Sequence, residues 1–406
     1  MKISVIGQGY VGLTISMGAL SAGHEVLGVD YSEGLVTSLK SGKSHIEGIS
    51  DSDISSGIKS GKFLPTSDYS LIAESDVVVI AVPTPLNEFG RPDLAMLESA
   101  AKSVGGALKK RALIINESTS FPGTLRDVIR PLVEKGSPLE HMYAISPERV
   151  DPGNKNFGTK NTPRIVGGMS DEARDKAVEF YRSFCDHVVP VSSPEVAEAA
   201  KLFENTFRFI NIGLVNEFAQ VMGAMGIPVD EVLSAAATKP YGFMPFHPNV
   251  GIGGHCIPVD PMYLQQKAKE IGVESKYIAV SEAINHEMPK FIVSRLRTEL
   301  GGLRGKKIQV AGVSYKANIA DTRETPAIDV VKLLESEGAE VSWHDPLVSS
   351  WNGSNSSPLN SSVDAGLVLV AHDEFDPSGW GSVPVYSINR HSRYSWTPLI
   401  TVKSKY

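Results

Sequence analysis

A cysteine placed between glycines and prolines is the residue of this sequence best suited to covalent chemistry. Cys256 follows the run Gly251–His255, which holds three glycines, and precedes the segment Ile257–Pro261, which holds two prolines. Glycines let a backbone approach a ligand closely, and an accessible thiol acts as a nucleophile when its neighbours lower its pKa. The alternative is a buried structural cysteine, which is the commoner role. A metal site formed with His255 and Asp260 is disfavoured, because no second cluster of cysteine and histidine completes it.

A glycine loop near the start of the chain has the spacing of a dinucleotide-binding site. Gly7-Gln8-Gly9-Tyr10-Val11-Gly12 fits the pattern G-x-G-x-x-G, follows a short apolar segment and opens a helix predicted over residues 13–22. Gly7 permits a tight turn, Gly9 lets backbone N–H groups approach a pyrophosphate, and Gly12 lets the helix pack against the strand. Asp30 ends the next predicted strand, where it would accept from a ribose 2′-hydroxyl and repel a 2′-phosphate, which favours NAD over NADP. A plain turn without a cofactor is the alternative.

Other polar residues follow predicted strands or share a helix face. The loops Val82–Pro85 and Glu117–Thr119 each come after an apolar run, and ligands of parallel α/β sheets bind beyond the carboxyl ends of the strands. A rigid proline turn is the alternative for the first loop. Lys201 and Asn205 are four residues apart in a helical pattern, so they share a face and together could stabilise an oxyanion. Periodicity alone favours a solvated surface pair.

Strands and helices alternate through the first part of the chain and again near its end. Apolar runs predict strands at residues 3–6, 26–30, 76–82, 113–116 and 164–168, with helices at 94–108 and 171–184. Residues 194–225 predict one long helix, with Ser193 as its cap and Pro194 in its first turn. After further helical pattern, strands are predicted at 307–313, 340–345 and 367–371, with a helix at 326–337.

This alternation predicts an α/β fold in which two Rossmann-like parallel-sheet domains are joined by a long central helix and a helical domain. The domain boundaries are expected at residues 1–192, 193–300 and 301–406. The stretch Ser349–Ser362 is rich in serine, asparagine, glycine and proline, and we expect it to be a mobile surface loop.

Composition argues against several classes of protein. The 406 residues are 42% hydrophobic and 21% charged, which argues against wholesale disorder, and the net charge of −7 gives no basic stripe for nucleic acid. No apolar run of about 18 residues is present, and the N-terminus lacks the cationic start of a signal peptide, so we expect no membrane span. Two cysteines in so long a chain indicate reduced thiols and a cytoplasmic protein. Cys185 lies in an apolar helix end, and we expect it to be buried for packing.

Taken together, these segments resemble the UDP-glucose/GDP-mannose dehydrogenase family, the UDP-sugar 6-dehydrogenases, from residue 1 to about residue 346. The motifs that carry the resemblance are GQGYVG (7–12), VPTP (82–85), ESTSFPGT (117–124), SPERVDPGN (146–154), KLFENTFR (201–208), GGHCIPVDP (253–261) and GVSYKANIADTRETPA (312–327). The histidine before the cysteine and the segment Ala237–Phe246 are most similar to the UDP-N-acetylglucosamine branch. The chain departs from the family at His247, Asn249 and Val250, in the loop that the resemblance places against the sugar.

The resemblance implies an NAD-dependent, four-electron oxidation of the sugar C6 alcohol to a carboxylate. An aldehyde has no hydride to give until a nucleophile adds to it, so Cys256 would form a thiohemiacetal and then a thioester, which water hydrolyses. Lys201 and Asn205 would stabilise the oxyanion, which replaces the solvated interpretation of this pair. Asp260 and Thr119 would order the water that serves as base, and Glu148 would assist thioester hydrolysis.

The resemblance also assigns ligands to residues of this sequence. NAD contacts are implied at Gly7, Gly9, Tyr10, Val11, Gly12, Asp30, Val82, Pro83, Thr84, Thr119 and Arg323. Substrate contacts are implied at Glu148, Arg149, Lys201, Asn205, Arg208, Tyr241, Phe243, Phe246, Gly253, Tyr315 and Lys316. Lys316 would pair with the pyrophosphate of the sugar nucleotide, the central helix would form a homodimer, and no metal, membrane or nucleic acid is expected as a partner.

The expected substrate is UDP-N-acetylglucosamine, with UDP-glucose or UDP-N-acetylmannosamine as alternatives. A non-catalytic nucleotide-sugar-binding protein is an alternative of another class. The presence of Cys256, Lys201, Asn205 and Asp260 argues against that last alternative.

Overall fold

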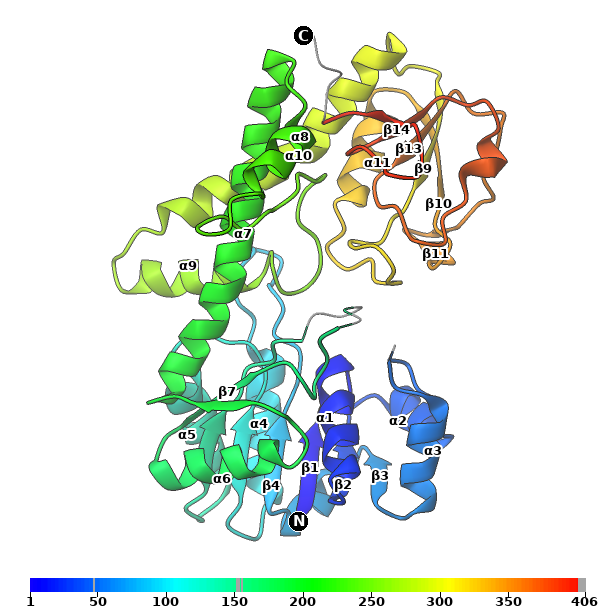
Figure 1. The fold of residues 1–406 in the computed structure, drawn as a ribbon. Coiled ribbons are helices and arrows are strands. Elements are labelled where there is room, and N and C mark those ends of the chain that lie inside the picture. The colour runs from blue at the N-terminus through cyan, green and yellow to red at the C-terminus, as the bar shows by residue number, and fades with distance from the viewer. Residues whose placement is uncertain (47, 151–153, 155, 401–406) are drawn as a thin grey trace. The chain divides into compact units, whose positions relative to one another are not determined.

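The computed structural model describes residues 1–46, 48–150, 154 and 156–400, which form two compact units. The first unit comprises Met1–Glu204 and Met262–Lys267, and the second comprises Asn205–Pro261 and the chain from Ala268 onward. Figure 1 shows the strands and helices of both. Residues 151–153 of the SPERVDPGN motif lie outside the described residues. The division into three domains stays a prediction.

A predominantly parallel eight-stranded sheet forms the centre of the first unit. Its strand order is β3-β2-β1-β4-β5-β6-β7-β8, and β6 and β7 pair antiparallel. The order reverses between β1 and β4, and ligands of such sheets bind at this switch point. The strands are β1 Lys2–Ile6, β2 Glu25–Val29, β3 Phe63–Thr66, β4 Val77–Ile80, β5 Leu113–Asn116, β6 Met142–Ile145, β7 Arg164–Gly168 and β8 Val188–Pro190. The predicted α/β fold is thus confirmed, and β3, β6 and β8 are strands that the sequence analysis did not predict.

Both faces of this sheet are buried under helices. Val77 and Val79 of β4 belong to the core shared with α1 and α6, whereas Val78 and Ile80 belong to the core shared with α4 and α5. Alternate residues of a strand point to opposite faces, so a strand covered on both sides is an unbroken apolar run. The helices of this part of the chain are α1 Tyr10–Ser21, α2 Glu33–Lys40, α3 Asp51–Lys59, α4 Ala95–Ala107, α5 Arg130–Gly136 and α6 Asp171–Arg182, with a 3₁₀-helix at Tyr69–Glu74 and a π-helix at Leu125–Ile129.

The long helix α7 spans Pro194–Met225, as the sequence predicts. The Ser193 hydroxyl accepts a hydrogen bond from the Val196 N–H at 3.4 Å, which supports its predicted capping role. Farther along, Gly213 lies against Ser281 of α10, where an added Cβ atom would come within 2.9 Å of the Ser281 Cβ. The remaining helices are α8 Val229–Ala236, α9 Asp260–Glu270, α10 Lys276–Leu300 and α11 Ala327–Ser336, with a 3₁₀-helix at Pro377–Trp380.

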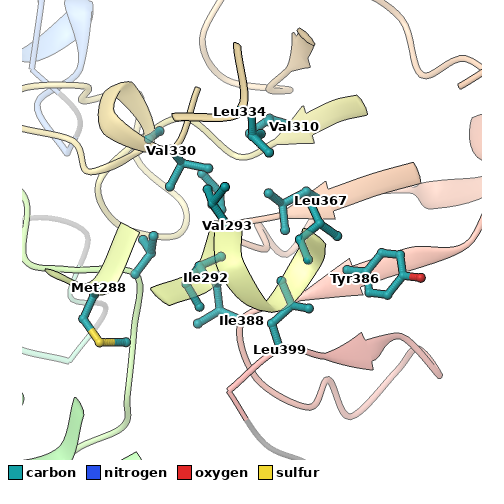
Figure 2. Packing of buried hydrophobic residues seen from close by; sticks show 14 of the residues in the cluster. Met288, Ile292, Val293, Val310, Val330, Leu334, Leu367, Tyr386, Ile388 and Leu399 are labelled. Atoms are coloured by element: carbon teal, nitrogen blue, oxygen red, sulfur yellow. The ribbon is translucent and has the colours of Figure 1, made fainter. Parts of the chain in front are cut away.

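A second, five-stranded parallel sheet belongs to the second unit. Its order is β10-β9-β13-β14-β15, with β9 Lys307–Ala311, β10 Glu340–His344, β13 Ala365–Val368, β14 Val385–Ser387 and β15 Thr397–Pro398. Figure 2 shows Ile292 and Val293 of α10 amid the side chains of this sheet and of α11. Both residues are fully buried in the same core as Leu367 and Ile388. The apolar face of α10 therefore holds the helix to the sheet.

Part of the stretch Ser349–Ser362 forms a hairpin where the sequence predicted only a loop, and the mobility of this stretch stays a prediction. Ser350–Trp351 (β11) and Ser354–Asn355 (β12) form an antiparallel hairpin. Asn352 and Gly353 both have positive φ, the conformation that an Asn-Gly hairpin turn requires. The Trp351 ring packs edge-on against Trp343 at 5.7 Å, and the Trp343 indole N–H donates to the Ser354 hydroxyl at 2.7 Å. These contacts fasten the hairpin to β10.

Candidate active site

The glycine loop between β1 and α1 has close approaches that only glycine allows. Gly7 has a φ of 88°, and a Cβ atom there would lie 2.5 Å from the carbonyl oxygen of Ala81. A Cβ atom on Gly12 would lie 1.7 Å from the carbonyl oxygen of Gly7. At Gly9, by contrast, no described atom other than those of its chain neighbours lies within 4 Å of the Cβ position. Packing within the protein does not demand glycine at Gly9, whereas close approach of a pyrophosphate does.

Asp30 follows β2 and anchors the glycine loop. Its Oδ2 accepts a hydrogen bond from the Gln8 N–H at 2.7 Å, and its Oδ1 accepts from the Ser32 N–H at 2.9 Å. Helix α1 begins at Tyr10, after Gly9 as its N-cap, and has no acidic residue in its first turn. The N–H groups of that turn favour an anion. The loop, the helix start and Asp30 therefore fit an NAD cofactor.

The loops that follow β4 and β5 are joined by one serine. The Ser118 hydroxyl accepts from the Val82 N–H at 3.0 Å and donates to the Val82 carbonyl at 2.8 Å. Thr84 and Thr119 are half-buried. Because β4 and β5 are parallel neighbours, both loops lie at the carboxyl edge of the sheet, where the sequence predicted them.

Glu117, the first residue after β5, belongs to a buried cluster of charged groups. The Arg164 guanidinium donates through Nη1 to both oxygens of Glu117, at 2.7 and 2.8 Å, and through Nη2 to Glu148 Oε2 at 2.7 Å. The Tyr181 hydroxyl donates to Glu117. Sequence reasoning missed Arg164 and Tyr181, since they belong to β7 and α6 and no local spacing connects them to Glu117.

This cluster shifts the pKa values of its two carboxyl groups in opposite directions. Burial raises the pKa of Glu117 to about 7, although the Arg164 charge opposes it. Burial also acts on Glu148, but the charge of Arg164, the N–H groups of Val150 and Arg149 and the charge of Lys201 outweigh it and lower its pKa. The two N–H groups donate to Glu148 Oε1 at 2.7 Å each. Glu148 is therefore a fixed carboxylate with the Lys201 ammonium nearby.

Helix α7 carries the lysine and the asparagine that the sequence pairs. Lys201 is 9% exposed and Asn205 is 6% exposed, so their interpretation as a solvated surface pair is wrong. Arg149 forms an ion pair with Glu204 at 2.6 Å, between Nη2 and Oε1. Arg208, in contrast, is exposed.

A buried carboxyl on α7 also escaped the sequence analysis. Glu198 accepts hydrogen bonds from the Gly123 N–H at 2.6 Å and from the Leu125 N–H at 3.0 Å. Burial, with smaller contributions from the charges of Glu195 and Asp127, raises its pKa to about 7, although these two N–H bonds oppose the shift. Glu198 thus holds the end of the ESTSFPGT segment against the helix that carries Lys201. The signal available in the sequence was a glutamate three residues before Lys201 on the same helical face.

In the second unit, Cys256 lies in the turn that leads into α9. Its carbonyl accepts from the Val259 N–H at 3.1 Å and from the Asp260 N–H at 2.8 Å. The Asn205 amide donates to Asp260 Oδ2 at 2.5 Å. Cys256 is half-buried, whereas Cys185 is buried among apolar side chains and burial raises its pKa to about 11. The predicted packing role of Cys185 is therefore confirmed.

The glycines before Cys256 pack against the loop that follows β9. An added Cβ atom on Gly253 would come within 2.7 Å of the Tyr315 Cβ, and one on Gly254 within 2.8 Å of the Tyr315 ring. Gly254 N–H donates to the Arg323 carbonyl at 3.0 Å. The pKa of Arg323 is raised first by its hydrogen bonds with Asp321, with smaller contributions from Tyr315 and Cys256. Arg323, whose guanidinium pairs with the Asp321 carboxylate, therefore lies near the thiol.

The loop after β9 repeats the geometry of the glycine loop. Gly312 has a φ of 76°, and a Cβ atom there would lie 1.9 Å from the Val370 carbonyl oxygen. Asp345 follows β10 and accepts from the Val313 N–H at 2.8 Å, just as Asp30 accepts from Gln8. The Ser314 hydroxyl donates to the Lys316 carbonyl at 3.1 Å. Lys316 thus follows a strand end that is built like the glycine loop after β1.

The aromatic residues expected at the substrate differ in their surroundings. Tyr241 is 72% exposed and Phe243 is 40% exposed, while the Phe246 ring packs edge-on against Phe207 at 5.9 Å. Within the described ranges, no three histidine, cysteine or acidic side chains group so as to hold a metal ion. None of the described helices is both long enough and apolar enough to cross a membrane.

Comparison with known proteins gives three matches to one family. Models of the UDP-glucose/GDP-mannose dehydrogenase family match its NAD binding domain at residues 1–185, its central domain at 195–287 and its UDP binding domain at 309–387. The UDP-N-acetyl-D-glucosamine 6-dehydrogenase of Pseudomonas aeruginosa is 34% identical, over 98% of this chain and 97% of its own length. The UDP-N-acetyl-D-mannosamine dehydrogenase of Pyrococcus horikoshii is 35% identical, over 94% and 92%.

Solved structures agree with these sequence matches. The UDP-D-ManNAc dehydrogenase of Pyrococcus horikoshii has a TM-score of 0.89 at 31% identity, covering 98% of this chain and 99% of its own. The UDP-N-acetyl-mannosamine dehydrogenase of Staphylococcus aureus has a TM-score of 0.85 at 30% identity, covering 98% and 96%. The chain therefore belongs to the UDP-glucose/GDP-mannose dehydrogenase family and is an NAD-dependent UDP-sugar dehydrogenase.

Proposed function

We propose that this enzyme oxidises C6 of UDP-N-acetylglucosamine to the carboxylate through a covalent intermediate on Cys256. The observation that carries the proposal is the local arrangement around the thiol. Cys256 is half-buried in a turn closed by Asp260, and Asp260 is held by Asn205. A nucleophile, a carboxylate and an amide donor are thus fixed together in one unit, which suits addition to a carbonyl carbon.

The proposed reaction has two oxidations and one hydrolysis. NAD, when bound, supplies the hydride acceptor for each oxidation. Between them, the Cys256 sulfur adds to the C6 aldehyde to give a thiohemiacetal, and the second oxidation converts this to a thioester. Water then breaks the carbon–sulfur bond, which releases the carboxylate and restores the thiol.

Charge develops on the C6 oxygen in both covalent steps. Asn205 would donate its amide N–H to that oxygen, and the Lys201 ammonium would supply positive charge. The proton of the C6 alcohol would pass to a water held by Asp260 and Thr119. Asp260 suits this task because it is 2% exposed and accepts the Asn205 amide at 2.5 Å.

Hydrolysis of the thioester is assigned to Glu148. Its lowered pKa keeps it ionised at neutral pH, so it can accept a proton from the attacking water. Its bonds with Arg164 and with two backbone N–H groups fix its orientation.

NAD would lie on Gly7–Gly12, Asp30 and the loops after β4 and β5. Contacts of NAD with Arg323, and of the sugar nucleotide with Tyr315 and Lys316, complete the proposal.

The choice of sugar is supported by the His255–Cys256 context and by similarity to the Pseudomonas aeruginosa enzyme named for UDP-N-acetyl-D-glucosamine. UDP-N-acetylmannosamine is a second candidate, because the Pyrococcus horikoshii enzyme named for that sugar is equally similar. The test is a panel of UDP-N-acetylglucosamine, UDP-N-acetylmannosamine and UDP-glucose with NAD⁺. We expect two NADH per UDP-N-acetylglucosamine consumed. Higher kcat/KM for another sugar would reassign the substrate, and no NADH with any of them would contradict the proposed reaction.

The covalent step has its own test. Cys256→Ser should abolish acid formation, and a folded variant that still forms acid at the normal rate would remove the thioester from the mechanism. Cys185→Ser is the matched control, since that thiol packs in the first unit.

We also propose a homodimer formed through α7. Phe207, Leu214, Val221 and Met225 are 40%, 59%, 49% and 53% exposed, and their spacing places them along one side of the helix. An apolar stripe of this kind is covered by another surface more often than by water. Analytical ultracentrifugation should show a dimer, and Leu214→Lys should yield monomers. A wild-type monomer at micromolar concentration would contradict this proposal.

A further inference from the structure

Two loops of the first unit carry proposed contacts with NAD, and they follow neighbouring strands. Val82–Pro85 follows β4, and Glu117–Thr124 follows β5, which pairs with β4 in parallel. Ser118 joins the loops close to the strand ends through its two bonds with Val82. Farther along, both loops contact a single side chain from a distant part of the chain, Tyr263 of α9.

Tyr263 is fully buried and reaches both loops at once. Its hydroxyl donates to the Thr84 carbonyl at 3.1 Å, with the Pro85 carbonyl a longer second acceptor at 3.4 Å. Its ring lies 6.5 Å from the Phe121 ring, tilted by 34°. One helical turn later, the Lys267 ammonium lies 4.8 Å above the Phe121 ring, a cation–π distance.

The composition of the first loop explains why it needs an external donor. Pro83 and Pro85 have no backbone N–H, so the loop offers few N–H donors for hydrogen bonds to its own carbonyl groups. The Pro85 carbonyl also accepts from the Asp93 N–H at 2.9 Å. The Tyr263 hydroxyl donates to the backbone carbonyl of Thr84, whose neighbours along the chain are both prolines.

We propose that Tyr263 is a positioning residue for the cofactor: it fixes the loops after β4 and β5 in the shape that binds NAD. The inference rests on the proposed cofactor role of these two loops. It assigns Tyr263 no contact with the reacting atoms. Removal of its hydroxyl frees Thr84 and its neighbours to take other conformations, and NAD binding then has to order them again.

The test is the isosteric variant Tyr263→Phe, which keeps the ring against Phe121 and removes only the hydroxyl. We expect NAD⁺ binding, measured by titration calorimetry without sugar nucleotide, to weaken by about three- to tenfold, the range for one lost hydrogen bond. With sugar nucleotide and saturating NAD⁺, kcat should stay within about twofold of the wild type while KM for NAD⁺ rises. Tyr263→Leu, which also loses the ring contact, should weaken binding further.

The control is Tyr277→Phe, since Tyr277 is 78% exposed on α10. This variant should bind NAD⁺ as the wild type does. Wild-type affinity for NAD⁺ in folded Tyr263→Phe would overturn the inference. A purely structural role would lower the fraction of active protein and leave the dissociation constant unchanged. The calorimetry needs no turnover, so failure of the proposed reaction would leave the result on Tyr263 readable.

Discussion

The buried carboxyl of Glu198 gives the stability of the first unit a pH dependence that one substitution should remove. In the folded chain its pKa is about 7, whereas its ordinary value is 4.5. A group whose pKa is raised on folding adds stability at low pH and loses that contribution as the pH rises through the folded pKa. Glu198 should therefore make the wild type relatively more stable at acidic pH than a variant that cannot ionise there.

The magnitude follows from linkage. Each pKa unit corresponds to about 1.4 kcal/mol, and most of the shift is expressed between about pH 5 and about pH 8.5. Over that range the wild type should lose about 2.5 kcal/mol of unfolding free energy relative to Glu198→Gln. Glu117 also has a raised pKa, but it is present in both proteins, so its contribution cancels in the difference.

The assay is guanidinium denaturation of both proteins at the two pH values. All four tryptophans, residues 343, 351, 380 and 396, belong to the second unit, so their fluorescence follows that unit while circular dichroism follows both. The shift should be largest in the part of the dichroism transition that fluorescence does not report. Glu179→Gln, at an exposed position on α6, is the matched control and should leave the pH dependence unchanged.

One result would refute the reasoning about Glu198. If the difference in unfolding free energy between the wild type and Glu198→Gln is the same at both pH values, the carboxyl does not ionise in the range that its burial implies. A difference that grows in the opposite direction would mean that its two N–H bonds outweigh burial and lower its pKa.

Three further predictions address the cofactor loop, the candidate oxyanion site and the core. Gly12→Ala places a Cβ atom 1.7 Å from the Gly7 carbonyl oxygen, and because such overpacking costs ~1–3 kcal/mol, it should weaken NAD⁺ binding by about tenfold or more in calorimetry; unchanged affinity would contradict the packing argument. Asn205→Ala removes the donor to Asp260 and should lower kcat by about a hundredfold in steady-state assays, whereas an unchanged kcat would exclude Asn205 from the chemistry. Ile292→Ala opens a cavity in the core of the second unit and should lower its free energy of unfolding by about 2–5 kcal/mol, measured from denaturation followed by tryptophan fluorescence. A loss below about 1 kcal/mol would show that the site collapses around the smaller side chain.

The elements most predictable from sequence were those with long or strongly apolar patterns. The strand at Val77–Ile80 and the helix Pro194–Met225 appear as predicted, because an unbroken apolar run and a helical period over many turns are strong signals. The hairpin in residues 350–355 was missed because serine and asparagine dominate its composition. Its Asn352-Gly353 dipeptide was the available signal for a hairpin.

The residues of the candidate site were likewise predictable only where a local sequence pattern determines their geometry. The glycine loop and Asp30 could be predicted because a local pattern determines their geometry. Arg164 could not, since its partners Glu117 and Glu148 lie on other segments and meet it only through the folded sheet. For Lys201, periodicity alone gave the wrong environment, because a helix face that looks polar in sequence can still be covered by the rest of the chain.

The hydrogen bonds of Asp30 have a consequence for attempts to change the cofactor. Redesign of such enzymes for NADP starts by replacing the acidic residue that repels the 2′-phosphate. Here the same carboxylate accepts the Gln8 N–H at 2.7 Å and the Ser32 N–H at 2.9 Å. Replacement of Asp30 by alanine or glycine would remove both hydrogen bonds and leave the glycine loop less well ordered, which would weaken the binding of either cofactor. A variant selective for NADP therefore needs a substitute acceptor for the Gln8 N–H in addition to a new cation.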